Sequence, residues 1–292
     1  MSQQSVKIGN FELFTVETGR FMLDGGAMFG VVPKTLWSRK IPADDKNRIP
    51  MAARCLLIKS SVTGKLYLID TGCGDKFNEK MSDIYGLDFE HSNLDNSLDK
   101  IGIKKSEITD IIFTHLHFDH CGGTTSFNKN GDPELNFKNA TFHVNKRHWE
   151  IAINPNAREK ASFFPENLEP IKNSGRLNLV KDRHKFEEGL TTIPADGHTI
   201  GQQLPFIYDK HLALIYTADL IPTAAHVPLP WIMGYDMSPI QTLEEKEVFL
   251  DEAAGSNWYL YLEHDANNEV IQIAEDNGKY EVKKTMNFSD LA

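Results

Sequence analysis

Four potential metal ligands lie within six positions of this chain, at residues 115–120. Two of them are histidines spaced i, i+2, and an aspartate-histidine pair follows directly. One tetrahedral ion cannot easily use four such crowded groups, but two neighbouring ions can if distant parts of the chain supply more ligands. A two-metal site suits hydrolysis, because it makes hydroxide at neutral pH and stabilises the developing oxyanion. The four ligands are His115, His117, Asp119 and His120.

The residues around this motif favour a structured site. Residues 111–113 are apolar and, with Thr114, predict a buried strand, and Gly122-Gly123 predicts a tight turn. The alternative is a solvent-exposed histidine cluster, for which a buried strand is a poor setting. The motif therefore predicts a metal centre at the end of a strand.

Three further candidate ligands occur downstream, each directly after an apolar strand candidate. Taken singly, a histidine after a strand is more often a solvated loop residue, and an aspartate there is commonly a turn former. Taken together behind the dense motif, they predict the remaining ligands of a two-metal site. These residues are His198, Asp219 and His264.

The elements that must position these residues follow from the apolar pattern. Helices are expected over residues 94–101 and from about Leu243 to Ala254, the second with Thr242 and Glu245 as a capping box. Strands come first as a meander and later alternate with helices, which favours sheets with helices outside, in a single domain spanning residues 1–292. Strands are expected at residues 11–16, 53–59, 65–70, 110–114, 140–144, 190–194, 203–208, 212–217 and 258–262.

Composition limits the partners. The chain has 292 residues, of which 40% are apolar and 25% charged, as in an ordinary globular protein. Its net charge of −10 repels phosphate backbones and disfavours a nucleic-acid partner. Three cysteines suggest no disulfide framework, and the sequence has neither an apolar signal core at its start nor a run long enough to span a membrane. We therefore expect a cytoplasmic protein.

The complete set of motifs resembles the signature of the metallo-β-lactamase superfamily, over about residues 10–265. This resemblance implies an α+β fold, the four-layer αβ/βα sandwich, with the metals at one edge between two sheets. The motifs that carry it are Asp70-Thr71-Gly72, His115-x-His117-x-Asp119-His120, Gly197-His198-Thr199, Asp219 and His264.

The resemblance also implies a role for each residue. Asp219 would bridge the two metals, and Asp70 would orient a ligand histidine. Zinc is favoured, although a site rich in carboxylates also suits Mn²⁺ or Fe²⁺. The first metal would take His115, His117 and His198, and the second would take Asp119, His120 and His264.

One departure separates this chain from true β-lactamases. The best-known lactamase classes place a cysteine at the position of Asp219 and lack the Asp119-His120 pair. The chain is thus similar to the branch that contains lactonases, organophosphate hydrolases, glyoxalase II and tRNA-processing nucleases. Glyoxalase II needs a late basic cluster that this tail matches weakly, and the negative charge disfavours a tRNA nuclease.

The mechanism expected from such a site begins with a hydroxide that bridges the two metals and attacks a lactone or ester carbonyl. The resemblance implies that Asp119 accepts the hydroxide proton. Two apolar loops, residues 22–37 and 220–235, are expected to wall a pocket for an apolar ligand, to pack on each other, or to form the face of a homodimer.

Acyl-homoserine-lactone hydrolases of the superfamily, the quorum-quenching enzymes, carry a tyrosine three residues after the bridging aspartate. Here that position is Pro222, so another group must donate to the acceptor oxygen. The candidates are His226 and Tyr235, and His226 could equally be a hydrogen-bonded loop residue. We therefore expect hydrolysis of an acyl-homoserine lactone or a related apolar ester. The alternatives are an organophosphate or other phosphoester hydrolase, and a non-catalytic ligand sensor.

Overall fold

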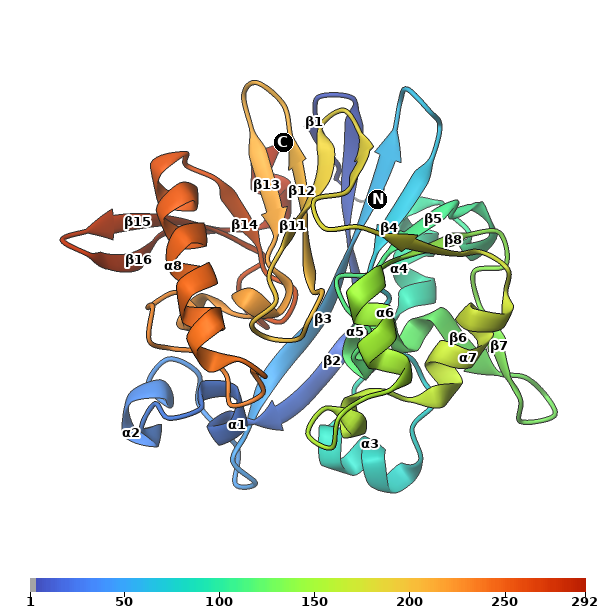
Figure 1. Cartoon of the computed structure of the whole chain (residues 1–292), viewed down its shortest axis with the longest axis horizontal. Helices are drawn as coiled ribbons and strands as arrows, with labels where there is room; N and C mark the ends of the chain where they lie inside the picture. The colour runs from blue at the N-terminus through green and yellow to red at the C-terminus, as the bar shows by residue number, and fades with distance from the viewer. Residues whose placement is uncertain (1–3) are drawn as a thin grey trace.

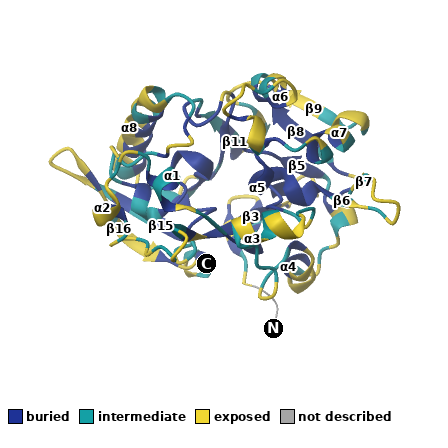
Figure 2. Cartoon of the chain, turned by 90° about the horizontal axis from the view of Figure 1, so that it is seen from below, coloured by how far each residue is buried: buried dark blue, intermediate teal, exposed yellow. Residues whose placement is uncertain are grey.

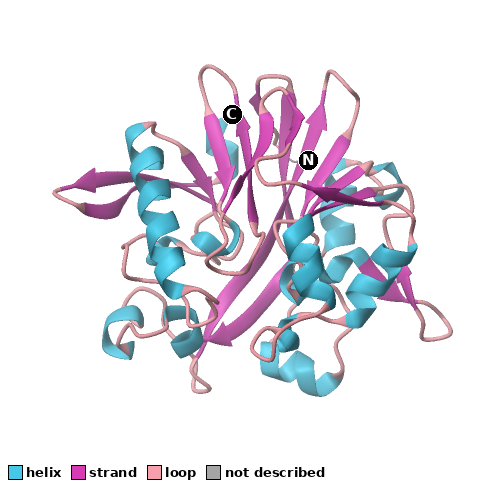
Figure 3. Cartoon of the chain, viewed as in Figure 1, coloured by secondary structure: helices cyan, strands magenta, loops and turns pink. Residues whose placement is uncertain are grey.

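Two seven-stranded sheets face each other at the centre of the molecule, and helices cover the outer face of each sheet (Figures 1 and 3). The computed structural model describes residues 4–292. The layers follow the order helix, sheet, sheet, helix, which is the expected αβ/βα sandwich.

The first sheet begins with long antiparallel strands and ends with parallel ones. The alternation expected at residues 11–16 extends much further, because β2 and β3 pair along nearly their whole length. In sheet order, the strands are β1 (Val6–Ile8), β2 (Phe11–Asp24), β3 (Arg48–Ser60), β4 (Leu66–Ile69), β5 (Asp110–Ile112), β8 (Thr141–Asn145) and β9 (Leu177–Val180).

The second sheet follows chain order from one edge to the other, with a single parallel pair, β13 and β14. A separate two-stranded ribbon joins β6 (Thr125–Phe127) and β7 (Pro133–Leu135). The strands are β10 (Lys185–Glu187), β11 (Leu190–Pro194), β12 (Gln203–Tyr208), β13 (Ala213–Tyr216), β14 (Tyr259–Tyr261), β15 (Val270–Asp276) and β16 (Lys279–Met286).

The helices fall into two groups (Figure 1). Those on the side of the first sheet are α3 (Glu79–Tyr85), α4 (Leu94–Ile101), α5 (Phe118–Cys121), α6 (Lys146–Ile153) and α7 (Pro165–Asn173). Those on the side of the second sheet are α1 (Gly25–Phe29), α2 (Lys34–Trp37) and α8 (Pro239–Gly255). Within residues 4–292, no helix is long and apolar enough to cross a membrane.

Three apolar clusters hold these layers together, and Figure 2 shows the buried residues concentrated along the sheets. The largest lies between the sheets and includes Leu56, Ile215 and Leu260. A second packs the outer face of the first sheet under α4, α6 and α7. The third joins Phe29 and Trp37 of the early loop to Phe118, beside the histidine motif.

Two expectations about local structure are wrong. The apolar segment 22–37, expected as a loop, contains the short helices α1 and α2. Helix α8 starts earlier than expected, with Pro239 in its first turn, where a missing N–H costs no hydrogen bond. Thr242 and Glu245 therefore do not form a capping box. Instead, Glu245 accepts hydrogen bonds from the backbone N–H groups of Asp196 and Gly197, directly before His198.

The turn after the histidine motif depends on close contact between two backbones. Gly72 and Cys121 form a β-bridge, and a Cβ placed on Gly122 would lie 1.9 Å from the carbonyl oxygen of Cys73. A side chain at this position would push apart the two loops that meet below the motif.

Gly122→Ala is accordingly expected to destabilise the protein by about 1–3 kcal/mol or more, because a backbone atom cannot yield as a side chain can. Gly255→Ala is the matched control: it lies at the end of α8, where a Cβ would meet nothing in the described chain within 4 Å beyond its own helix. Denaturant unfolding of both variants measures the difference, and equal midpoints would contradict the account.

Candidate metal centre

The motif is held as a tight turn at the end of β5. His117 precedes α5, and its carbonyl accepts hydrogen bonds from the N–H groups of His120 and Cys121, at 3.0 and 3.1 Å. The buried His148 fixes the turn from behind, because its Nε2 accepts a hydrogen bond from the N–H of Leu116 at 2.8 Å. Local backbone bonding thus turns successive ligands toward one point.

The first three predicted ligands converge through their ring nitrogens. His117 Nδ1 lies 3.0 Å from His115 Nε2 and 3.3 Å from His198 Nε2. Two nitrogens bound to one tetrahedral zinc are roughly 3.3 Å apart, given Zn–N bonds of about 2.0–2.1 Å. His198 comes from the loop after β11, so the structure brings together residues from both sheets.

The second predicted set lies beside the first. His120 Nε2 and His264 Nε2 are 3.1 Å apart, and Asp119 Oδ2 lies 3.9 and 3.8 Å from these two nitrogens. His264 follows β14 and is held there by β3, since its Nδ1–H donates to the carbonyl of Ala52 at 2.9 Å. All three side chains are buried.

Asp219 lies between the two sets with one oxygen toward each. Its Oδ2 is 3.1 Å from His198 Nε2 and 3.8 Å from His115 Nε2. Its Oδ1 is 3.1 Å from His264 Nε2 and 3.7 Å from His120 Nε2. Ala218, directly before it, has a φ of 42°, a left-handed conformation of the kind that often accompanies functional sites.

The donor set fits two divalent cations. Asp219 Oδ1 is buried and accepts no hydrogen bond within the described chain. Burial and the neighbouring imidazoles hold the pKa of His115 and His117 well below 6.5, which favours the neutral, ligating form. Against the opposing effect of burial, Asp219 raises the pKa of His198 to about 10 and that of His264 to about 9. The carboxylates therefore attract positive charge into the cluster.

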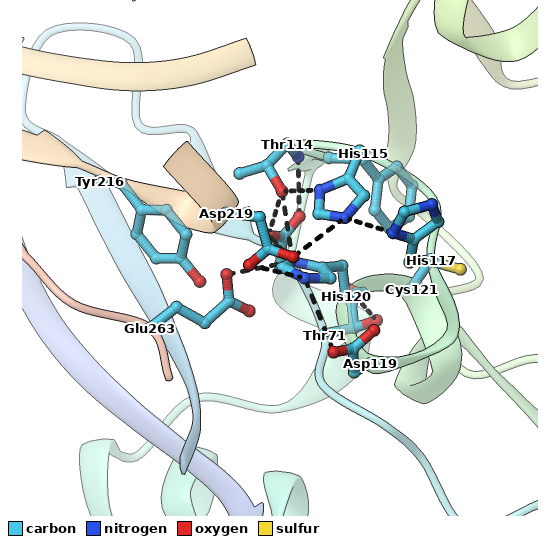
Figure 4. Close-up of polar contacts among 12 residues, drawn as sticks. Thr71, Thr114, His115, His117, Asp119, His120, Cys121, Tyr216, Asp219 and Glu263 are labelled. Atoms are coloured by element: carbon cyan, nitrogen blue, oxygen red, sulfur yellow. Dashed lines mark hydrogen bonds and ion pairs between the residues drawn. The ribbon is translucent and has the colours of Figure 1, made fainter. Parts of the chain in front are cut away.

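Outer contacts fix four of the five imidazoles. Asp70, for which the resemblance implied an orienting role, lies 3.1 Å from His120 Nδ1, and Thr114 Oγ1 lies 3.1 Å from His115 Nδ1 (Figure 4). Thr114 holds Asp70 through its N–H and its hydroxyl, at 2.8 and 2.6 Å. His117 is the exception, because its Nε2 has no hydrogen-bond partner in the described chain.

Two carboxylates near the ligands were not predicted from the sequence. Asp236 Oδ1 lies 3.0 Å from His198 Nδ1, and Glu263 Oε2 lies 3.1 Å from His120 Nδ1. Nothing in the spacing of the sequence links Asp236 to His198. For Glu263 the only signal was its position directly before His264.

A cavity of about 400 Å³ opens onto this cluster. Five of the predicted ligands reach its surface: His117, Asp119, His198, Asp219 and His264. Half of the other lining residues are apolar, and the rest include two tyrosines, one arginine and the buried Glu159. The lining residues that the sequence did not single out include Leu23, Tyr85, Phe118, Arg158 and Met237.

The geometry does not support His226 as a catalytic donor. Its Nε2–H donates to the carbonyl of Met28 and its Nδ1 accepts from the hydroxyl of Thr223, both at 2.8 Å. Its ring also stacks on Phe29, with centroids 4.5 Å apart, and burial lowers its pKa to about 4. His226 is absent from the cavity lining and has no free ring nitrogen, so it is a hydrogen-bonded loop residue.

Tyr235 does line the cavity, and Tyr85 joins it from the end of α3. Neither phenol hydroxyl has a hydrogen-bond partner within residues 4–292. Burial, followed by the charge of Asp119, raises the pKa of both tyrosines, so both hydroxyls keep their protons at neutral pH.

The two apolar loops both pack on each other and wall the cavity. The N–H of Gly234 donates to the carbonyl of Ala27 at 2.8 Å, while Met28 and Met233 line the cavity. The buried Lys246 of α8 holds the second loop, because its ammonium group donates to three carbonyls. These belong to Pro228, Leu229 and Trp231.

Comparison with known proteins places this geometry in context. A family model described as the metallo-beta-lactamase superfamily matches residues 48–264. A probable metal-dependent hydrolase from Staphylococcus aureus is similar over 96% of this chain and 100% of its own, with 29% identity and a TM-score of 0.85.

Two more distant structures share the fold. AidC, a dizinc quorum-quenching lactonase solved with a product, N-hexanoyl-L-homoserine, has 24% identity and a TM-score of 0.79, covering 98% of this chain and 99% of its own. The hydrolase AbOPH, of the beta-lactamase superfamily, has 18% identity and a TM-score of 0.78, with 99% of each chain covered.

Asp219→Ala should remove the group that both ligand sets share. We expect loss of hydrolytic activity and fewer than two bound ions per chain, because each set loses an oxygen ligand. Elemental analysis after gel filtration measures the ions. Full activity with two ions retained would rule out the bridging role.

Proposed function

Because the chain belongs to the metallo-beta-lactamase superfamily, we propose that it is a dinuclear metal-dependent hydrolase of a lactone or a related apolar ester. Membership of this superfamily and the buried histidine-aspartate cluster together identify a probable metal-dependent hydrolase. The observation that carries the substrate class is the cavity, which places the cluster next to apolar walls.

Two divalent ions, when bound, supply a hydroxide nucleophile at neutral pH and polarise the acceptor oxygen. The chain would then provide the proton transfers. Asp119 lines the cavity, and burial raises the pKa of its carboxyl group, which brings it closer to the pH at which a general base works well. We assign Asp119 the role of accepting the proton of the nucleophile.

The apolar lining suits an acyl chain. Met28, Phe118 and Met233 lie around the cavity, and a volume of about 400 Å³ falls within the range of small-molecule sites. Flexible methionine side chains also adapt to ligands of different shape. AidC, which has the same fold, was solved with a molecule that carries such an acyl chain, N-hexanoyl-L-homoserine.

Tyr235 is our proposed donor to the acceptor oxygen, in place of the tyrosine missing at Pro222. Its protonated hydroxyl can donate a hydrogen bond, and it lies on the cavity surface with Asp119. The homodimer expected from the apolar loops stays a prediction.

A panel of acyl-homoserine lactones, aryl esters and phosphotriesters tests the substrate class. We expect the highest kcat/KM for lactones with an acyl chain, because the cavity walls would bury that chain. A preference for phosphotriesters would overturn the ester assignment. Absence of bound metal after purification, together with no hydrolysis of any member of the panel, would favour the non-catalytic sensor.

Tyr235→Phe removes only the hydroxyl. If it donates to the acceptor oxygen, kcat should fall by about 10²-fold, as for loss of one oxyanion donor. Tyr208→Phe is the control, because Tyr208 lies on β12, outside the cavity lining. Tyr85→Phe is measured beside them. An unchanged kcat in Tyr235→Phe with a loss in Tyr85→Phe would move the role to Tyr85.

A further inference from the structure

Glu263 is a fully buried carboxylate that the function proposed above does not use. Its exposed fraction is 0%, and neither of its oxygens accepts a hydrogen bond within the described chain. Figure 4 shows it between Tyr216 and the ring of His120. The hydroxyl of Tyr216 donates instead to the carbonyl of Arg54, at 2.8 Å. Among residues 4–292, the one ionic contact of Glu263 is His120 Nδ1, at 3.1 Å from Oε2.

A buried carboxylate without donors is costly unless positive charge compensates it. The guanidinium of Arg54 is committed elsewhere, to Glu17 and to backbone carbonyls. His120 is the nearest group that can carry positive charge, and its Nε2 faces the second ligand set. The positive charge that compensates Glu263 must therefore lie on the His120 ring or on a cation bound at its Nε2.

Two carboxylates compete for the single Nδ1–H of His120. Asp70 Oδ2 and Glu263 Oε2 both lie 3.1 Å from this nitrogen. Asp70 has two other donors, the N–H and the hydroxyl of Thr114, whereas Glu263 has none in the described chain. Asp70 is thus satisfied by the fold itself, and Glu263 depends on the charge of the metal centre.

From this asymmetry we propose that Glu263 is a positioning residue that strengthens metal binding at the second site, made by Asp119, His120 and His264. An anion behind a ligand imidazole makes that imidazole a better electron donor to a cation. Glu263 also directly precedes His264, so one dipeptide supplies a ligand of the second site and the carboxylate behind another. The proposal rests on the metal centre proposed above.

A cation held directly by Asp70, His120 Nδ1 and Glu263 is a different use of the same residues, which lie within 4.8 Å of one another. The geometry disfavours it, because both oxygens of Asp70 already accept hydrogen bonds from Thr114. Such a cation would make a third site, which the number of bound ions reveals.

The test is a competition titration of metal-free protein with zinc and a chromophoric chelator, which measures each binding step without any substrate. Wild type should bind two ions. Glu263→Gln should weaken the second-site step by about 10–100-fold, the usual effect of losing an outer contact of a ligand. The other step should keep its affinity. Asp119→Ala, which removes a ligand of the second site alone, identifies that step.

Glu269→Gln is the matched control, because Glu269 accepts a hydrogen bond from the N–H of Phe288 and belongs to neither ligand set. Glu263→Asp withdraws the carboxylate but keeps its charge, so it should give a smaller loss and replaces Glu263→Gln if that variant does not fold. Unchanged affinities in both Glu263 variants would overturn this proposal alone. Three ions in wild type would also overturn it, and fewer than two would sink the metal centre itself.

Discussion

The structure depends on one electrostatic constraint, the crowding of five buried imidazoles around the carboxylate of Asp219. Ring nitrogens at 3.0–3.3 Å face one another across each ligand set. Neutral nitrogens at such distances oppose their lone pairs, and protonated ones oppose their charges. Cations shared with Asp219 relieve both conflicts, and the division of its two oxygens between the sets matches that arrangement.

The sandwich fold makes this crowding possible, because it brings loops of both sheets to one edge. β5 supplies the turn that carries four ligands, while His198, Asp219 and His264 follow strands β11, β13 and β14 of the other sheet. Contacts from outside the cluster then fix the rings, as Asp236 does for His198 and Ala52 for His264. The same edge carries the two apolar loops, so the metal centre and the cavity walls are assembled by one set of packing contacts.

Local patterns predicted sheets with outer helices and the candidate ligands, and the resemblance carried by those motifs implied the four-layer sandwich. The dense ligands after an apolar strand, and the ligating residues at the ends of later strands, can be recognised without knowing any distant contact. His226 misled because its partner, the carbonyl of Met28, lies 198 residues away in the chain. Tyr85, Asp236 and Glu263 were missed for the same reason, since tertiary packing alone brings them to the site. Helix α8 starts earlier than expected because Pro239 is tolerated in its first turn, and Glu245 bonds to the loop before His198.

Anomalous diffraction at a metal absorption edge, from crystals grown with zinc, tests the central claim most directly. The account predicts two peaks per chain, one on each side of the Asp219 carboxylate and about 3.5–4 Å apart, as in other two-metal sites. The first should lie among His115, His117 and His198, and the second among Asp119, His120 and His264. A single peak, or peaks that leave Asp219 without contact to both ions, would contradict it.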